Sequence, residues 1–140
     1  MRDFHDSITF RMNVVARKAS LGLQHGLKRY DVTPEQWSVL NVLNHKAPIS
    51  QKHVAELVEK DAPTVNRIMD VLVRKDLIVK IVDEKDRRVT LLSLSMEGKQ
   101  KVQMIRNVVE MTCVQFYKGI SDAELGVFLD ILMRIENNLE

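Results

Sequence analysis

The fold of this chain is decided by residues 61–94, whose sequence is DAPTVNRIMDVLVRKDLIVKIVDEKDRRVTLLSL. The first part of this stretch has the apolar spacing of a short helix with a polar outer face. Two runs of β-branched and aliphatic residues, 77–82 and 89–94, follow it. The six charged residues DEKDRR separate these runs, which predicts a hairpin with a solvated tip. A helix that fits a DNA groove, followed by a hairpin with arginines at its tip, is the element order of a winged helix.

The residues just before this stretch predict a partner helix. Ser50 is expected to be its N-cap, and Asp61 the N-cap of the next helix, with Pro63 in the first turn, where a missing N–H costs nothing. The inward-facing residues are predicted to be Val54, Ala55, Leu57 and Val58 on the first of these helices and Val65, Ile68, Met69 and Leu72 on the second. Two helices joined by a turn of a few residues make a helix-turn-helix.

Four more helices are expected outside this pair. From Phe4, apolar residues recur at steps of four as far as Leu27, which predicts a long amphipathic helix that ends at residues 30–32. Thr33-Pro34-Glu35-Gln36 forms a capping box for a helix that stops near Pro48. Ser95 is expected to cap a fifth helix, and the capping box at 121–124 opens a sixth. The predicted order is α-α-α-α-β-β-α-α.

Composition restricts the class of protein. The 140 residues suffice for one domain, with 45% hydrophobic and 29% charged residues, as in an ordinary soluble protein. Charges interrupt every apolar stretch well before the roughly 20 residues of a membrane span. Asp3 and Asp6 stand where a signal peptide needs an apolar core, so a cytoplasmic location is expected. The one cysteine cannot form an internal disulfide, in agreement with a reducing compartment.

The distribution of charge is more informative than its sum. The net charge is only +2, which is weak for a nucleic-acid binder. Residues 1–49 hold seven Lys/Arg against four Asp/Glu, residues 50–101 hold eleven against nine, and residues 102–140 hold three against six. The C-terminal part is therefore a poor partner for phosphates, and any contact with DNA must come from a local group of basic residues.

These elements and residues resemble the MarR family of bacterial transcription regulators over essentially the whole chain. The matching segments are VTPEQWSVL at 32–40, ISQ at 49–51 with VAEL at 54–57, DAPTVNR at 61–67, and DEKDRR at 83–88 followed by LSL at 92–94 and Glu97-Gly98. The chain departs from the family at Asp76, where glycine is usual, and at Lys80, where arginine is common and whose bidentate contact a lysine cannot reproduce.

The resemblance implies a mainly α fold with a small β-hairpin. Residues 1–140 are expected to form a single MarR-like domain. A winged helix-turn-helix lobe is expected at about 33–98, flanked by a helical dimerisation region at 1–30 and 99–140.

The outer face of the helix after Asp61 is the first candidate DNA contact. It carries Pro63, Asn66 and Arg67, with Thr64 at its boundary. Arginine forks to guanine O6 and N7, asparagine pairs with adenine, and threonine bonds a phosphate or contacts a thymine methyl group. The alternative is an ordinary solvated face, and the helix-turn-helix context favours DNA contact.

The wing and the preceding helix supply further candidates. By the resemblance, Arg88 is the wing arginine that enters the minor groove and Asp86 orients it, with Arg87 beside them. A narrow groove concentrates negative potential and attracts a guanidinium, although a plain solvated hairpin tip is the alternative. A weaker prediction assigns phosphate contacts to the start of the helix after Ser50, since helix N-termini and short polar side chains suit that role. These residues are Ser50, Gln51, Lys52 and His53.

The terminal helices resemble the family's dimerisation region, and the alternative is a monomer in which they fold back. The sequence therefore predicts a homodimeric DNA-binding transcription regulator. It is expected to repress by binding a palindromic operator in double-stranded DNA and to leave it when a small-molecule effector binds. A winged helix used for protein–protein contact is the alternative function.

Other chemistry finds little support in the sequence. It has no Gly-rich phosphate loop, and no nucleophile with a base and an orienting third group, so no catalytic residues and no enzyme are expected. The four histidines lie far apart, so no metal site is expected, and no cofactor either. Cys113 falls within an apolar repeat, where a core position is the default prediction and sensing the alternative. An effector pocket cannot be assigned to residues.

Overall fold

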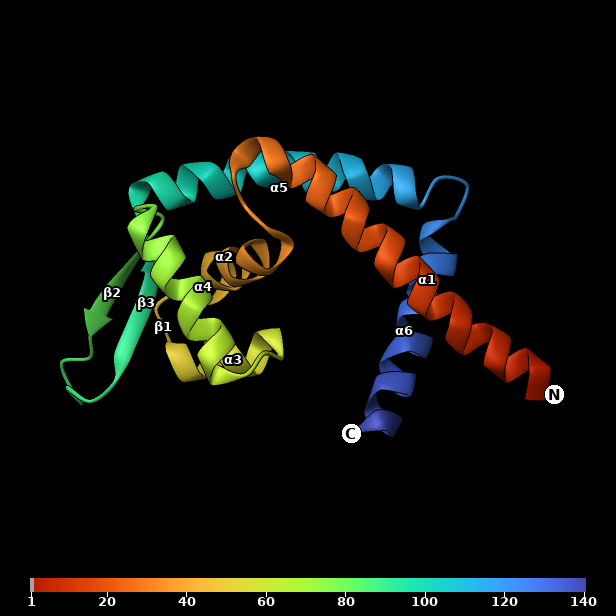
Figure 1. Ribbon diagram of the computed structural model, residues 1–140, viewed down its shortest axis with the longest axis horizontal. Coiled ribbons are helices and arrows are strands. Elements are labelled where there is room, and N and C mark those ends of the chain that lie inside the picture. Colours follow the sequence, from red (N-terminus) through yellow and green to blue (C-terminus); the bar gives the residue numbers. More distant parts are fainter. Residues whose placement is uncertain (1) are drawn as a thin grey trace.

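The computed structural model describes residues 2–140 (Figure 1). In this part of the chain the elements follow in the order α1 (Arg2–Leu27), η1 (Lys28–Tyr30), α2 (Pro34–Lys46), β1 (Ile49–Ser50), α3 (Gln51–Val58), α4 (Ala62–Arg74), β2 (Ile78–Val82), β3 (Thr90–Leu94), α5 (Met96–Phe116) and α6 (Asp122–Leu139). The predicted mainly α class with a small hairpin is confirmed. All predicted helices are present, and η1 is a short 3-10 turn after α1.

The hairpin is part of a three-stranded antiparallel sheet in the order β1-β3-β2. Lys80 of β2 lies opposite Leu92 of β3, and β1 adds two residues on the other side of β3 through the pair Ile49–Leu92. Strand β1 was not predicted from the sequence. Because Ser50 is both the end of this strand and the N-cap of α3, the pairing fixes the start of α3 against the middle of β3.

Side-chain caps define where the helices begin. Thr33 and Ser121 form full capping boxes with Gln36 and Glu124. The other N-cap side chains that accept the expected backbone N–H are those of Ser50, Asp61 and Ser95. The predicted helix starts at these five residues are therefore confirmed.

The buried core belongs to one lobe of the molecule. Between residues 3 and 140, every buried hydrophobic residue falls in the span from Leu27 to Ile105. The core includes Val65, Met69 and Leu72 of α4, as predicted, with Ile68 partly buried. Leu57 was predicted to face inward on α3, and this prediction is wrong. Its side chain is 45% exposed, because Val54 and the partly buried Ala55 and Val58 already fill the inner face of this eight-residue helix.

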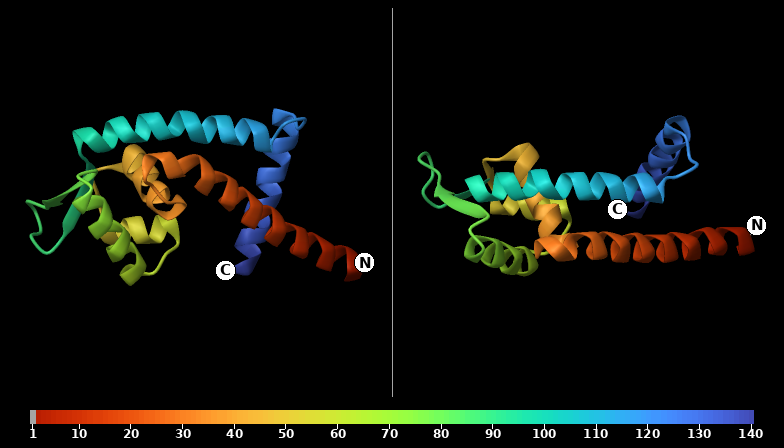
Figure 2. Two further views of the ribbon diagram at one scale, coloured as in Figure 1. Left: turned by 45° about the horizontal axis from the view of Figure 1, so that its top comes forward. Right: turned by 90° about the horizontal axis from the view of Figure 1, so that it is seen from above.

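The terminal helices extend away from this lobe. The N-terminal end of α1 and all of α6 lie at the end of the molecule opposite the hairpin (Figures 1 and 2). Near Leu27, α1 packs closely on α5, where Gly22 faces the Phe116 ring and Gly26 faces Val108. The predicted apolar stripe of α1 is present, but its N-terminal part is exposed, as at Ile8 and Val15. None of the described helices is long and apolar enough to cross a membrane.

Candidate nucleic-acid interface

Two exposed features lie on the side of the lobe away from α5: the start of α4 with its neighbour α3, and the hairpin tip (Figure 1). Helix α4 buries Val65, Met69 and Leu72, so the opposite side of the helix faces solvent. Pro63, Asn66 and Arg67 are exposed on this side, and Thr64 is half-buried at its edge. The structure thus brings the four predicted residues together at the N-terminal end of α4, where backbone N–H groups and the helix dipole favour negatively charged groups.

Arg67 and the start of α4 are tied together by side-chain contacts. The Arg67 Nη2 atom donates to Thr64 Oγ1 at 3.3 Å, and the Thr64 backbone N–H donates to Asp61 Oδ1 at 2.8 Å. These contacts with Thr64 hold the pKa of the Asp61 carboxyl below its ordinary value. The result is a fixed first turn with a guanidinium on its outer edge.

Asn66 has a partner that was not predicted from the sequence. The Gln51 side chain donates from Nε2 to Asn66 Oδ1, and so connects the first turn of α3 to α4. Gln51 was predicted to contact phosphate, but its amide is turned to α4. In this arrangement the Asn66 Nδ2 group remains the available donor toward a base edge. Residues 51 and 66 meet only because α3 and α4 cross, and no local sequence signal indicates such a contact.

The other predicted phosphate contacts lie at the start of α3. Ser50 Oγ accepts the His53 backbone N–H at 3.2 Å, so this hydroxyl is used as a cap. Lys52 and His53 are exposed. This helix end therefore presents one cationic side chain, that of Lys52, and an imidazole.

The hairpin tip holds Arg88 in a defined orientation. Its Nε and Nη2 atoms donate to Asp86 Oδ1 and Oδ2 at 3.1 and 3.3 Å, and its backbone N–H donates to Oδ1 at 3.0 Å. The Arg88 side chain is 91% exposed, whereas that of Asp86 is 41% exposed. The side-chain and backbone donors of Arg88 lower the pKa of the Asp86 carboxyl. A guanidinium held on one side by a carboxylate, with the rest of its surface in water, is suited to enter a groove.

Two further charges near α4 are paired. Asp70, on the outer side of α4, would repel phosphate unless it is paired, and Arg74 is a basic neighbour four residues further along the same helix. The structure instead places Lys80 of β2 at 3.7 Å from the Asp70 carboxylate, while Arg74 Nε bonds the backbone oxygen of Asp70. Lys80 thus connects the hairpin to α4. Arg87 is exposed at the tip beside Arg88.

The described residues do not suggest a metal centre. Across residues 3–140, no three His, Cys, Asp or Glu side chains lie close enough together to hold a metal ion. Cys113 is half-buried on α5, so its predicted core position is only partly met.

Comparison with known proteins identifies the family. Residues 30–89 match the family model described as "MarR family". The fold is that of a mutant of MarR from E. coli solved in complex with operator DNA, with a TM-score of 0.85 and 20% identity over 92% of this chain and 93% of that one. Residues 30–89 belong to the MarR family by this match, and the fold of the whole chain is the MarR fold.

Other solved structures share the MarR fold. CouR from Rhodococcus jostii RHA1, solved bound to p-coumaroyl-CoA, is 23% identical, covers 94% of this chain and 92% of its own, and has a TM-score of 0.86. A protein of unknown function from Listeria innocua Clip11262 is 44% identical over 100% of this chain and 98% of its own, with a TM-score of 0.78. The MarR-type winged helix therefore accounts for the element order predicted from residues 61–94.

Proposed function

We propose that this chain is a sequence-specific DNA-binding regulator that acts as a homodimer on a palindromic operator, and that it represses transcription. The observation that carries the proposal is the pair of exposed features on one side of the lobe. Asn66 and Arg67 face solvent from α4, and Asp86 holds Arg88 outward at the hairpin tip. This arrangement suits α4 for the major groove and the wing for the adjacent minor groove.

In this proposal the residues have different tasks. Arg67 and Asn66 contact base edges, Thr64 and Pro63 fit the helix start against the backbone, and Arg88 inserts into the minor groove. Lys52, His53 and Arg87 supply phosphate contacts, with Ser50 and Gln51 fixing the helix end that carries the first two. Asp86 acts by orienting Arg88.

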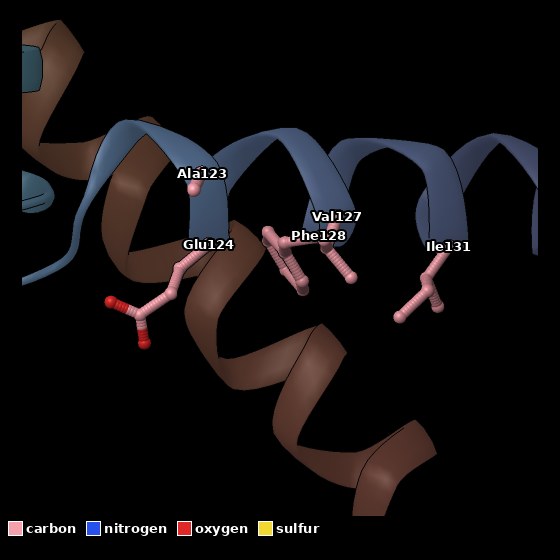
Figure 3. Close-up of a pocket in the computed structure, with 5 residues that line it drawn as sticks. All are labelled: Ala123, Glu124, Val127, Phe128 and Ile131. Atoms are coloured by element: carbon pink, nitrogen blue, oxygen red, sulfur yellow. The ribbon is translucent and has the colours of Figure 1, made fainter.

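The terminal helices support assembly into a dimer. Helix α6 has no buried residue, and large apolar side chains are exposed along α1, α5 and α6, as at Phe10, Met111 and Phe128. Large apolar side chains exposed in such number are typical of a protein–protein contact. Some of them form a shallow hollow on α6, lined by Ala123, Glu124, Val127, Phe128 and Ile131 (Figure 3). Two-fold pairing through these helices places two α4 helices for successive half-sites of a palindrome.

We further propose that a small-molecule effector releases the DNA. CouR, which shares this fold, was solved with p-coumaroyl-CoA bound. In some conformations of the dimer, the spacing of the two DNA-binding lobes does not fit the operator. A ligand that binds more tightly to such a conformation would shift the dimer toward it and so release the DNA.

Fluorescence anisotropy with labelled DNA from the gene's own upstream region tests the proposal. Titration at two salt concentrations, beside a scrambled duplex, is expected to show tight binding that prefers the native sequence. Arg88→Ala should weaken binding to all sequences and lower the salt slope by about one, since it removes one groove cation. Arg67→Ala should cost roughly 1–3 kcal/mol and relax base preference at one position.

Arg17→Ala serves as a control, because Arg17 is exposed on α1, far along the chain from the hairpin and α4. Parent-like binding by both Arg67→Ala and Arg88→Ala would overturn the assignment of these residues. If the parent protein binds the native DNA no more tightly than the scrambled duplex, this result would favour the protein–protein alternative.

A further inference from the structure

Four long-range side-chain contacts meet at the connection between α1 and α2. Lys75, the C-cap residue of α4, donates from Nζ to the backbone oxygen of Asp31. The same ammonium lies 3.3 Å from Asp31 Oδ2 and 3.4 Å from Gln36 Oε1. From the other side, Lys101 of α5 donates to the backbone oxygen of Tyr30 at 3.0 Å. Two lysines from distant parts of the chain therefore hold one short turn.

This turn is itself firmly placed. Asp31 adopts the left-handed conformation, with φ of 56°, and caps η1. Leu27 before the turn and Val32 after it are both buried in the core. Gln36, the third acceptor, belongs to the capping box at the start of α2. The ammonium of Lys75 thus contacts the point at which α1 enters the lobe.

The Lys75 ammonium can donate a hydrogen bond to each of its oxygen partners. A lysine ammonium has three donors, and the structure offers it three oxygens. Its side chain is only 27% exposed, whereas the Asp31 side chain is 88% exposed. An exposed carboxylate adds little to such a pair, so the backbone oxygen and the Gln36 amide provide most of the constraint.

We propose that Lys75 is a positioning residue for DNA recognition, which transmits the position of α1 to helix α4. This inference rests on the proposed function. Helix α4 has thirteen residues, and its first turn carries Asn66 and Arg67 while its last residue leads to Lys75. A packed helix moves as a rigid element, so a shift of its C-terminal end displaces the base-contacting end by a similar distance. Lys75 thereby determines the separation at which two α4 helices of a dimer meet the operator, without contacting DNA.

Binding to operators of altered spacing tests this role. The variants are Lys75→Met, which keeps the aliphatic stem, Lys75→Arg, which keeps the charge, and Lys99→Met as the control, because Lys99 is an exposed lysine on the same helix as Lys101. Each is titrated by anisotropy against the operator, against operators with one base pair added or removed between the half-sites, and against a scrambled duplex. Circular dichroism and thermal unfolding monitor the fold.

We expect Lys75→Met to lower operator affinity about three- to thirtyfold and to reduce the preference for the native spacing. Binding to the scramble and the salt slope should stay as in the parent, and Lys75→Arg should restore part of the loss. Should Lys75→Met fail to fold, Lys101→Met, which loosens the same turn from the α5 side, is expected to give the same signature.

Suppose that the parent binds its operator and that folded Lys75→Met keeps the same operator affinity and the same spacing preference. This result would overturn this inference and leave the proposed function standing. Equal weakening on operator and scramble, with a salt slope smaller by about one, would make Lys75 a phosphate contact and also overturn it. A parent without operator preference would overturn the proposed function, and this inference with it.

Discussion

Single residues at the hairpin tip differ in what they contribute to DNA binding, although they carry similar charges. Asp86 and Glu84 are both acidic side chains of the DEKDRR segment, and electrostatics alone predicts that removing either one strengthens binding to a polyanion. Only Asp86 holds the guanidinium of Arg88 through two side-chain bonds. Orientation and charge thus oppose each other at this position.

We expect Asp86→Ala to weaken operator binding roughly three- to tenfold, because the loss of Arg88 orientation outweighs the removal of one negative charge. Glu84→Ala is the matched control and should leave binding equal or slightly stronger. Anisotropy titrations at low and moderate salt measure both. An increase in affinity for Asp86→Ala would mean that the carboxylate has no orienting role.

At this scale the sequence predicts residue types and the local Asp86–Arg88 pair well, and pairings between elements poorly. Asn66, Arg67 and Arg88 were placed on exposed surfaces by helix periodicity and by the hairpin pattern, and they are exposed there. The Gln51–Asn66 and Asp70–Lys80 contacts were not predicted. Each depends on how two elements cross, which is fixed by the core and leaves no periodic mark in the sequence.

The α4–β2 turn lies close against the start of α5. Ser95 donates from its backbone N–H to Leu77 O and from its hydroxyl to Asp76 O. A Cβ atom on Gly98 would lie 2.0 Å from the Leu77 oxygen, so the close approach requires glycine. Asp76 occupies the left-handed region with φ of 59°, at the position where the family usually has glycine.

Two substitutions at this junction should therefore change stability in opposite directions. Gly98→Ala must push the turn from α5 and is expected to lower the free energy of unfolding by about 1–3 kcal/mol. Asp76→Gly removes left-handed strain and should raise it by roughly 0.5–1 kcal/mol. Urea unfolding followed by circular dichroism measures both. A stability of Gly98→Ala equal to that of the parent would contradict the close contact.

The cap of α4 predicts a pH dependence. The contacts with Thr64 lower the pKa of Asp61 in the folded chain from its ordinary value of 3.8. A carboxyl with a lowered folded pKa stabilises the fold above its ordinary pKa, and this contribution is lost as the pH falls through the folded value. Asp86 and Glu124 act in the same direction.

The urea concentration at the unfolding midpoint should accordingly decrease as the pH is lowered from 6 to 3. Asn caps a helix about as well as Asp but does not titrate, so Asp61→Asn is expected to stay close to the parent at pH 6 and to lose less at pH 3. Equal losses in parent and variant would show that the charge of Asp61 does not stabilise α4.

Helix starts and strand pairing differed in how far the sequence could predict them. The N-caps at Thr33, Ser50, Asp61, Ser95 and Ser121 were all predicted correctly, because a cap involves residues within one turn. Strand β1 was missed because its two residues become a strand only by pairing with Leu91 and Leu92 of β3. The inward face of α3 was predicted to include Leu57, which is exposed. In a helix this short, the neighbouring elements decide how many positions are covered.

In the molecule as a whole, the buried core stops short of both ends of the described chain. It runs from Leu27 to Ile105, while α6 carries exposed apolar residues along its length. The sequence predicted these amphipathic stripes, but periodicity is the same whether a stripe packs within one chain or against a second one. Which of the two holds is therefore outside the reach of the sequence pattern.

The proposed dimer predicts the effect of a charge on this surface. Phe128, 52% exposed on α6, should be buried by a partner, so Phe128→Lys is expected to produce monomers and to weaken operator binding about a hundredfold or more, because paired half-sites no longer act together. Asn137→Lys adds the same charge at an exposed polar position of α6 and should leave the dimer intact. Sedimentation velocity at micromolar concentration distinguishes the two. A parent that sediments as a monomer would refute the proposal.

A helix without a buried residue also has a consequence for gene control. If α6 gains its core only from a second chain, assembly depends on the abundance of the protein. Below the dissociation constant of the dimer, operator occupancy then rises with the square of the chain concentration, which gives a steeper dose response than a monomeric repressor. Dilution of the protein by growth would open the promoter abruptly, and a twofold change in its synthesis would change transcription by more than twofold.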